Sequence, residues 1–298
     1  MHQLSQQDEQ FVQDFERKAQ LIKDRVSSVI HGYHVGCYLV GRPGTSKSWT
    51  VRTELEKYEE PWAFQNARMT PMGLFDFLAN HPEHTIVLDD IGTLFKSDQA
   101  MQILMAALDG NPSKPRTVTY KSKDKDLHFQ FSGTIIAISN VPLRHDPLAQ
   151  ALGSRIVVLE HEPTDDELAA YARSLALRGF EDLDADECLQ VVEFVLEETR
   201  EYDLRLDLRH VTKAWQDFRQ EKHGKAKTCW QDLVRTSLQK LVANPMAQSK
   251  KDEIEQEVQT VLEMKRRFPD DTQRQMAASG LKKSTFYKRL AEAKRRSA

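Results

Sequence analysis

The chain has 298 residues, of which 29% are charged and 40% are hydrophobic, a composition typical of a folded protein with about two domains. No apolar run approaches the roughly 20 residues that a membrane-spanning helix needs, and the first residues lack the basic and apolar segments of a secretory signal. The three cysteines are far apart and form no CxxC pair, which argues against a disulfide framework and a zinc site. These features predict a cytoplasmic protein.

The net charge of −3 is distributed unevenly along the chain. From Met264 to Ala298 the sequence has 11 Lys and Arg but only 3 Asp and Glu, whereas the rest of the chain is acidic. This asymmetry predicts that any affinity for nucleic acid is concentrated in the C-terminal segment.

The first half of the chain alternates between predicted helices and strands. The predicted helices cover residues 6–30, 71–80 and 97–108, with another directly after residue 48. The predicted strands cover residues 37–40, 62–64, 85–88, 134–138 and 156–159. Between residues 116 and 131 the apolar residues recur with a period of two around a polar turn, which predicts a β-hairpin. This alternation predicts an α/β fold with an open, mostly parallel sheet.

After Pro163 the strand patterns stop and helical patterns take over. Thr164 and Glu167 have the spacing of a capping box, which predicts a helix start. The helices expected in this half cover residues 164–177, 185–199, 207–218 and 228–242. We therefore expect an N-terminal helix (1–30), an α/β domain (31–163), a helical domain (164–245) and a linker with a basic tail (246–298).

A glycine-rich segment, Gly41-Arg42-Pro43-Gly44-Thr45-Ser46-Lys47-Ser48, follows the first predicted strand and precedes a helix. In a phosphate-binding loop of this kind, backbone N–H groups surround the phosphates and the lysine reaches the outer ones. The Ser48 hydroxyl is then expected to bind Mg²⁺. Ser46 occupies the place that glycine usually has. The segment predicts binding of ATP with Mg²⁺.

Two aspartates end the apolar strand at residues 85–88. Asp89 is placed to hold Mg²⁺, and Asp90 is placed to orient the water that attacks the terminal phosphate. Glutamate is the more usual residue at the second place, so Asp90 is one methylene short and slow hydrolysis is expected.

In these motifs and their order, residues 35–220 resemble the AAA+ ATPases, whose Walker A and Walker B motifs match Gly41 to Ser48 and Thr85 to Asp90. The resemblance implies that Asn140 is sensor 1, contacting the γ-phosphate and the water. It implies that Arg155 is an arginine finger acting on the ATP of a neighbouring subunit, and that Arg209, with Arg205 as its rival, is sensor 2. The implied architecture is a P-loop αβα sandwich followed by an α-helical lid and a small helical C-terminal unit, assembled as a ring or helical homo-oligomer.

The hairpin lies directly before the strand that ends at Asn140. In AAA+ proteins with a hairpin there, and in the related superfamily 3 helicases, it reaches into a central channel and contacts nucleic acid or substrate. Lysines at its tip suit a phosphate backbone, although alternating aspartates also fit a solvated turn. The candidate DNA-binding residues at this tip are Lys121, Lys123 and Lys125.

The basic tail has two predicted helices separated by Gly280 and resembles a helix-turn-helix. Leu281, Phe286 and Leu290 are expected to pack against the first helix. The side chains expected to face a DNA groove and its phosphates are Lys282, Lys283, Ser284, Thr285, Lys288 and Arg289. Many motifs of this shape bind proteins instead, and that alternative remains.

Together these features predict an AAA+ ATPase that acts on DNA as an accessory loader or regulator of a replication or transposition enzyme. DNA and a second DNA-processing protein are the expected partners. Two alternatives remain: a DNA-translocating helicase of the superfamily 3 type, and a DNA-bound switch that binds ATP with little turnover.

Overall fold

The computed structural model describes residues 3–66, 69–90, 97–123, 126–143, 147–243, 250–269 and 271–296. The chain forms two compact units, Met1–Arg235 and Thr236–Ala298. Within the described ranges, no helix is both long enough and apolar enough to cross a membrane. The predicted boundaries at residues 163 and 245 remain predictions.

The larger unit is built on a five-stranded parallel sheet with the strand order β2-β3-β6-β1-β7. Its strands are β1 (Gly36–Val40), β2 (Trp62–Asn66), β3 (Thr85–Asp89), β6 (Thr134–Ser139) and β7 (Val157–Glu160). Every residue of β1, β3 and β6 is buried, as expected for parallel strands covered on both faces. The predicted α/β fold with a P-loop is therefore confirmed.

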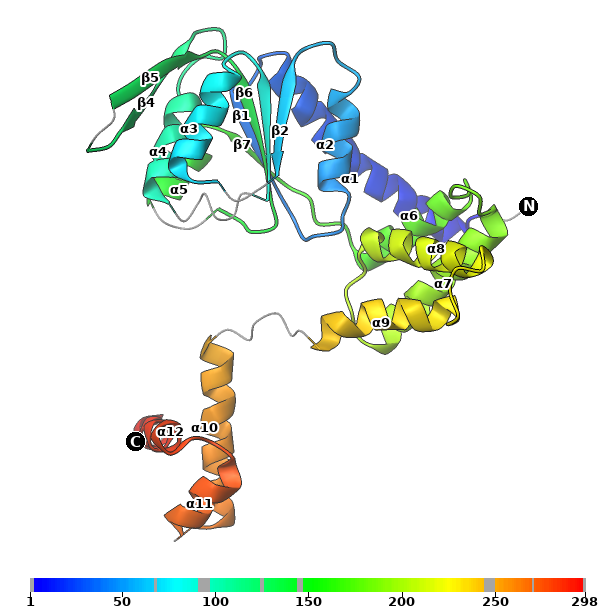
Figure 1. Ribbon diagram of the computed structural model, residues 1–298, viewed down its shortest axis with the longest axis vertical. Helices are drawn as coiled ribbons and strands as arrows, with labels where there is room; N and C mark the ends of the chain where they lie inside the picture. Colours follow the sequence, from blue (N-terminus) through cyan, green and yellow to red (C-terminus); the bar gives the residue numbers. More distant parts are fainter. Residues whose placement is uncertain are drawn as a thin grey trace. The chain divides into compact units, whose positions relative to one another are not determined.

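Helices cover both faces of this sheet, which gives three layers (Figure 1). On one face, α1 (Gln6–Ile30) and α2 (Lys47–Leu55) pack their apolar side chains against β1, β3 and β6. On the other face lie α3 (Pro71–Asn80), α4 (Asp98–Ala107) and α5 (Pro147–Gly153). All five strands run in the same direction, so their carboxyl ends meet at one edge of the sheet.

The predicted hairpin is present as β4 (Arg116–Lys121) and β5 (Asp126–Phe131), which pair from Arg116↔Phe131 to Lys121↔Asp126. Phe75 of α3 contacts the rings of Tyr120 and Phe129, with centroid distances of 5.7 and 5.0 Å. Only Ser132 and Gly133 separate β5 from β6, and both of their N–H groups donate to the carbonyl of Pro82 at 2.8 Å. The base of the hairpin is therefore joined tightly to the sheet.

The helices after the sheet are α6 (Asp165–Ala176), α7 (Ala185–Glu201), α8 (Leu208–Lys222) and α9 (Trp230–Ala243), and we refer to α6–α8 as the lid. The predicted capping box at Thr164 and Glu167 is confirmed, with both of its hydrogen bonds present. The indole N–H of Trp215 in α8 donates to the carbonyl of Cys188 in α7 at 3.1 Å. This bond satisfies a polar group within the apolar core of the lid.

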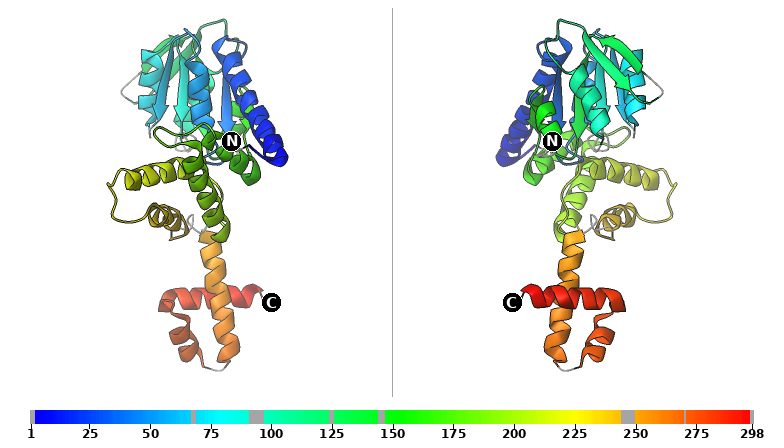
Figure 2. Two further views of the ribbon diagram at one scale, coloured as in Figure 1. Left: turned by 90° about the vertical axis from the view of Figure 1, so that its right-hand side faces the viewer. Right: turned by 90° about the vertical axis from the view of Figure 1, so that its left-hand side faces the viewer.

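The smaller unit contains α10 (Lys250–Arg267), α11 (Thr272–Ser279) and α12 (Lys283–Arg296). Figure 2 shows α12, in red, crossing α10, in orange. Gly280 ends α11 with a φ of 67°, a left-handed conformation that favours glycine. Phe286 of α12 is fully buried. Its predicted packing against α11 remains a prediction.

Candidate nucleotide-binding site

The glycine-rich loop connects β1 to α2 and turns through two left-handed residues. Gly44 has a φ of 74°, and a Cβ added to it would collide with the carboxylate of Asp207. Ser46 has a φ of 66° and makes no side-chain capping bond to α2. The chain therefore adopts the loop conformation without the usual glycine, at a conformational cost of roughly 1 kcal/mol.

Replacing Ser46 with glycine is expected to raise the free energy of unfolding by about 1 kcal/mol, because glycine has no Cβ to strain this φ. Urea denaturation of the ligand-free protein measures the change. Ser46→Ala is the matched control, since alanine keeps the Cβ and should bring no gain. An equal gain in both variants would show that the backbone conformation is not the cause.

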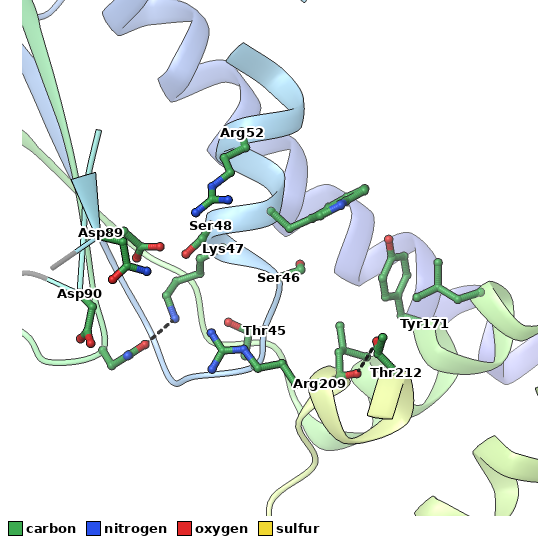
Figure 3. A pocket seen from close by; sticks show the side chains of 16 residues that line it. Thr45, Ser46, Lys47, Ser48, Arg52, Asp89, Asp90, Tyr171, Arg209 and Thr212 are labelled. Atoms are coloured by element: carbon green, nitrogen blue, oxygen red, sulfur yellow. Dashed lines mark hydrogen bonds between the residues drawn. The ribbon is translucent and has the colours of Figure 1, made fainter. Parts of the chain in front are cut away.

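Lys47 begins α2 with its ammonium group buried at the end of β1. Its Nζ donates to the carbonyls of Gly41 and Arg42, both at 2.6 Å. It also donates to Oδ1 of Asn140 at 3.2 Å, the bond drawn as a dashed line at Lys47 in Figure 3. Burial lowers the pKa of Lys47 to about 8, although the carboxylate of Glu162 acts in the opposite direction. A phosphate beside this amine would favour its charged form.

The pKa of Lys47 predicts that nucleotide affinity depends on pH. Below pH 8 the amine is charged before the nucleotide arrives, whereas above pH 8 binding has to take up a proton. The dissociation constant for ATP is therefore expected to be about tenfold higher at pH 9 than at pH 7. Isothermal titration calorimetry measures this, and Lys47→Arg, which stays charged, should give a flat profile. A flat profile in the wild type would contradict the prediction.

Polar side chains end three neighbouring strands at the carboxyl edge of the sheet. Asp89 ends β3 and is buried, and Asn140 follows β6 and accepts the bond from Lys47. Asp90 is exposed and left-handed, with a φ of 55°, and its N–H donates to the carbonyl of Ile138 at 3.1 Å. Asn66, at the end of β2, pairs in register with Asp89. This edge therefore gathers carboxylate and amide groups next to Lys47.

A cleft with a volume of about 580 Å³ lies between this edge, the loop and the lid (Figure 3). It brings together most of the residues that the motifs predict. These are Gly44, Thr45, Ser46, Lys47, Ser48, Asp89, Asp90, Asn140 and Arg209. The lining residues that the sequence analysis missed are Trp49, Arg52, Asn66, Tyr171, Leu175, Leu208 and Thr212. Volume and lining suit a nucleotide-sized ligand.

The first part of the loop is bound to the segment that leads into α6 and does not line the cleft. The backbone N–H of Arg42 donates to Glu162 Oε1 at 2.8 Å, and its guanidinium donates to the carbonyl of Pro163 at 3.1 Å and pairs with Asp165. Arg42 thus ties the loop to the segment at the start of α6, and Gly41, Arg42 and Pro43 are not among the residues that line the cleft.

Two further hydrogen bonds join the loop to the residue after β7 and to the start of α8. Nε2 of the buried His161 lies 3.0 Å from the carbonyl of Thr45, and burial lowers the pKa of this imidazole. The N–H of Leu208, the first residue of α8, donates to the carbonyl of Gly44 at 3.0 Å. Arg209, the next residue, lines the cleft near Lys47, whereas its rival Arg205 is not among the lining residues.

Arg155 lies outside the cleft of its own chain. Its guanidinium donates to Asp109 Oδ1 at 3.2 Å and to the carbonyl of Ala151 at 2.7 Å, and a third of its side chain is exposed. In this conformation Arg155 therefore has no direct role in the cleft of its own chain. Its role in a neighbouring subunit remains a prediction.

The cleft offers oxygen ligands of the kind that Mg²⁺ prefers. They are the Ser48 hydroxyl, the carboxylates of Asp89 and Asp90, and the side-chain carbonyl of Asn66. Among the described residues, no three His, Cys, Asp or Glu side chains form a metal site by themselves. Because Mg²⁺ is usually bound through one or two carboxylates together with phosphates, these residues fit Mg²⁺ held jointly with a nucleotide.

The predicted DNA-binding residues at the hairpin tip are only partly available. Lys121 forms an ion pair with Asp126 at 2.9 Å, and this partner raises the pKa of the lysine. Lys123 is exposed, and Lys125 lies outside the described residues.

In the smaller unit, the structure corrects one prediction. Arg289, expected to point outward, is only 9% exposed and pairs with Glu257 of α10 at 2.6 Å, because it faces the interior between α10 and α12. Lys282, Lys283 and Lys288 are exposed as predicted, and Thr285 is half-buried. The Ser284 side chain lies outside what the structure describes.

Among known proteins, the chain is similar to solved structures only in the comparison of folds. No protein-family model and no curated protein matches the chain. Three variants of RuvB from Thermotoga maritima are similar, with TM-scores of 0.44, 0.45 and 0.41 at 16%, 14% and 15% identity. The alignments cover 95%, 94% and 98% of this chain and 88%, 83% and 88% of those chains. At identities this low the similarity concerns the fold, and the chemistry has to be inferred from the residues of the cleft.

Proposed function

We propose that this chain is an AAA+ ATPase that binds ATP with Mg²⁺ in the cleft and hydrolyses it at subunit interfaces. The observation that carries this proposal is the convergence on one cleft of the buried Lys47 and Asp89 with Ser48 and Asn140. These four residues come from three separate segments of the chain. A site of this composition has cations and donors on several sides of a triphosphate, which is what phosphoryl transfer requires.

Each group has a distinct role in the proposed reaction. Lys47 and the N–H groups at the start of α2 bind the outer phosphates. Asp90 orients the attacking water, and Asn140 holds that water or the terminal phosphate from the end of β6. Asp89 and Ser48 would hold Mg²⁺, which, when bound, offsets charge on the phosphates. These residues sit on rigid strand ends and a helix start, which keeps them positioned for the reaction.

The proposed assembly is a head-to-tail ring or helical homo-oligomer. Arg155 reaches no group of its own cleft, so it can assist hydrolysis only at the nucleotide of a neighbour. A heterologous interface repeated from subunit to subunit supplies such an arginine to every site.

DNA is the proposed substrate of the assembly, and a replication or transposition enzyme is its proposed partner, which this chain loads or regulates. Support comes from the exposed Lys282, Lys283 and Lys288 at the start of α12 in a basic segment. A helix start with exposed lysines suits contacts with a phosphate backbone.

Removing these three charges by Lys282→Ala, Lys283→Ala and Lys288→Ala is expected to weaken DNA binding. The slope of the logarithm of the association constant against the logarithm of the salt concentration should fall by about one for each phosphate that the variant no longer neutralises. Fluorescence anisotropy with a labelled duplex at several salt concentrations measures both effects. The matched control removes three exposed charges from the larger unit through Arg17→Ala, Lys225→Ala and Lys227→Ala. Equal losses in both variants would show that the tail is not the DNA-binding element.

A second candidate function is a switch that binds ATP but hardly hydrolyses it. The strained, left-handed Asp90 and its short side chain favour this candidate, because the carboxylate lies closer to the backbone than a glutamate would. Tight ATP binding without measurable phosphate release, with or without DNA, would support the switch and overturn the ATPase.

A further inference from the structure

Arg52 is a cation of the cleft that none of the nucleotide-binding motifs explains. It lies on α2 four residues after Ser48 and therefore on the same helix face. Long side chains on a helix point back toward its N-terminus, which is where the phosphates bind. Figure 3 shows the guanidinium next to Ser48 and on the side of the cleft where Asp89 lies.

The contacts of Arg52 leave its hydrogen-bond donors available. Its guanidinium carbon lies 3.7 Å from the centroid of the Phe64 ring, which belongs to β2. Within the part of the chain that the structure describes, Arg52 forms neither an ion pair nor a side-chain hydrogen bond. An aromatic face attracts the cation by about 0.5–1 kcal/mol at an exposed site, but it is only a weak acceptor of hydrogen bonds from the guanidinium N–H groups. Phe64 thus holds the Arg52 side chain at the cleft, while the guanidinium N–H groups of Arg52 remain available to a ligand.

The two ends of the cleft differ in chemistry, which orients the nucleotide. Tyr171, Leu175 and Leu208 of the lid form an apolar end suited to a base. The opposite end has Asp89, with Asn66 beside it, where the terminal phosphate and its metal ion belong. Arg52 lies at this second end.

Resting on the proposed function, we infer that Arg52 binds the γ-phosphate of ATP from within the same subunit. A guanidinium can donate two parallel bonds to phosphate oxygens, which Lys47 cannot do. Because ADP lacks the γ-phosphate, Arg52 distinguishes ATP from ADP before any neighbour supplies Arg155. The free subunit is thus selective for the triphosphate.

The test compares a non-hydrolysable ATP analogue with ADP on the full chain, by calorimetry with Mg²⁺ at concentrations too low for assembly. For Arg52→Gln, affinity for the analogue is expected to fall by about 10-fold to 100-fold, the range for hydrogen bonds to a charged group. Affinity for ADP is expected to stay within about twofold of the wild-type value, since its phosphates contact only the loop. Arg52→Lys should fall between wild type and Arg52→Gln.

The matched control is Arg17→Gln, which removes an exposed arginine of α1 and should change neither affinity. Retained ADP binding also shows that Arg52→Gln is folded. Equal losses for both nucleotides, or no loss for either, would overturn the inference while leaving the proposed function intact. A wild-type chain that bound neither nucleotide would overturn the proposed function and this inference with it.

Discussion

Replacing Lys47 with alanine is expected to reduce ATP hydrolysis by about 10²–10³-fold, because the site then lacks its only buried ammonium donor to the phosphates among the described residues. The methyl group of alanine also leaves the carbonyls of Gly41 and Arg42 without the donor that Lys47 supplies. Steady-state phosphate release measures the loss, and calorimetry with ATP shows how much of it reflects binding.

Lys57→Ala is the matched control for that experiment. Lys57 lies just after α2, is exposed and pairs with Glu54, so its removal changes the same charge outside the cleft. Turnover of this variant should equal that of the wild type. Unchanged turnover in Lys47→Ala, with a fold intact by circular dichroism, would show that hydrolysis occurs elsewhere or not at all.

Arg155→Ala is expected to lower hydrolysis by about 10³-fold or more, in the range measured for arginine fingers, without weakening ATP binding to the free subunit. The stronger test mixes this variant with Lys47→Ala. Each is inactive alone, but a mixed interface combines the intact Lys47 of one subunit with the intact Arg155 of its neighbour. With random assembly about one quarter of the sites regain both groups, so about that share of wild-type turnover should return.

The mixing experiment separates action in a neighbour from action within one chain. Complementation between the two variants requires that Arg155 and Lys47 of one working site come from different subunits. No recovery in a mixture that still assembles, as checked by sedimentation, would contradict the trans role of Arg155 and point to its bond with Asp109 as a structural contact.

Local patterns in the sequence were sufficient to predict the sheet and the loop. Buried parallel strands are continuous apolar runs, so β1, β3 and β6 stand out, and the polar residues that end them identify the edge where Lys47, Asp89 and Asn140 meet. Asn66 is also a polar residue at the end of a strand, beside Asp89. It was missed because the predicted strand ended two residues too early.

Contacts between segments far apart in the chain could not be predicted from the sequence. Tyr171 and Thr212 lie on lid helices with ordinary amphipathic patterns, and only tertiary packing brings them to the cleft. Arg289 was mistaken for an outward side chain because its partner, Glu257, is 32 residues away on another helix. A buried ion pair of this kind has no local signature.

The short connection at the base of the hairpin has a mechanical consequence. The N–H groups of Ser132 and Gly133 both donate to the carbonyl of Pro82. A Cβ at Gly133 would collide with the carbonyl of His84, so this connection is closely packed. β6 continues from the connection to Asn140, which contacts Lys47. A pull on the hairpin is therefore carried along a buried strand whose parallel hydrogen bonds resist shear. A force on the hairpin would thus reach the end of the cleft where Lys47 and Asn140 lie.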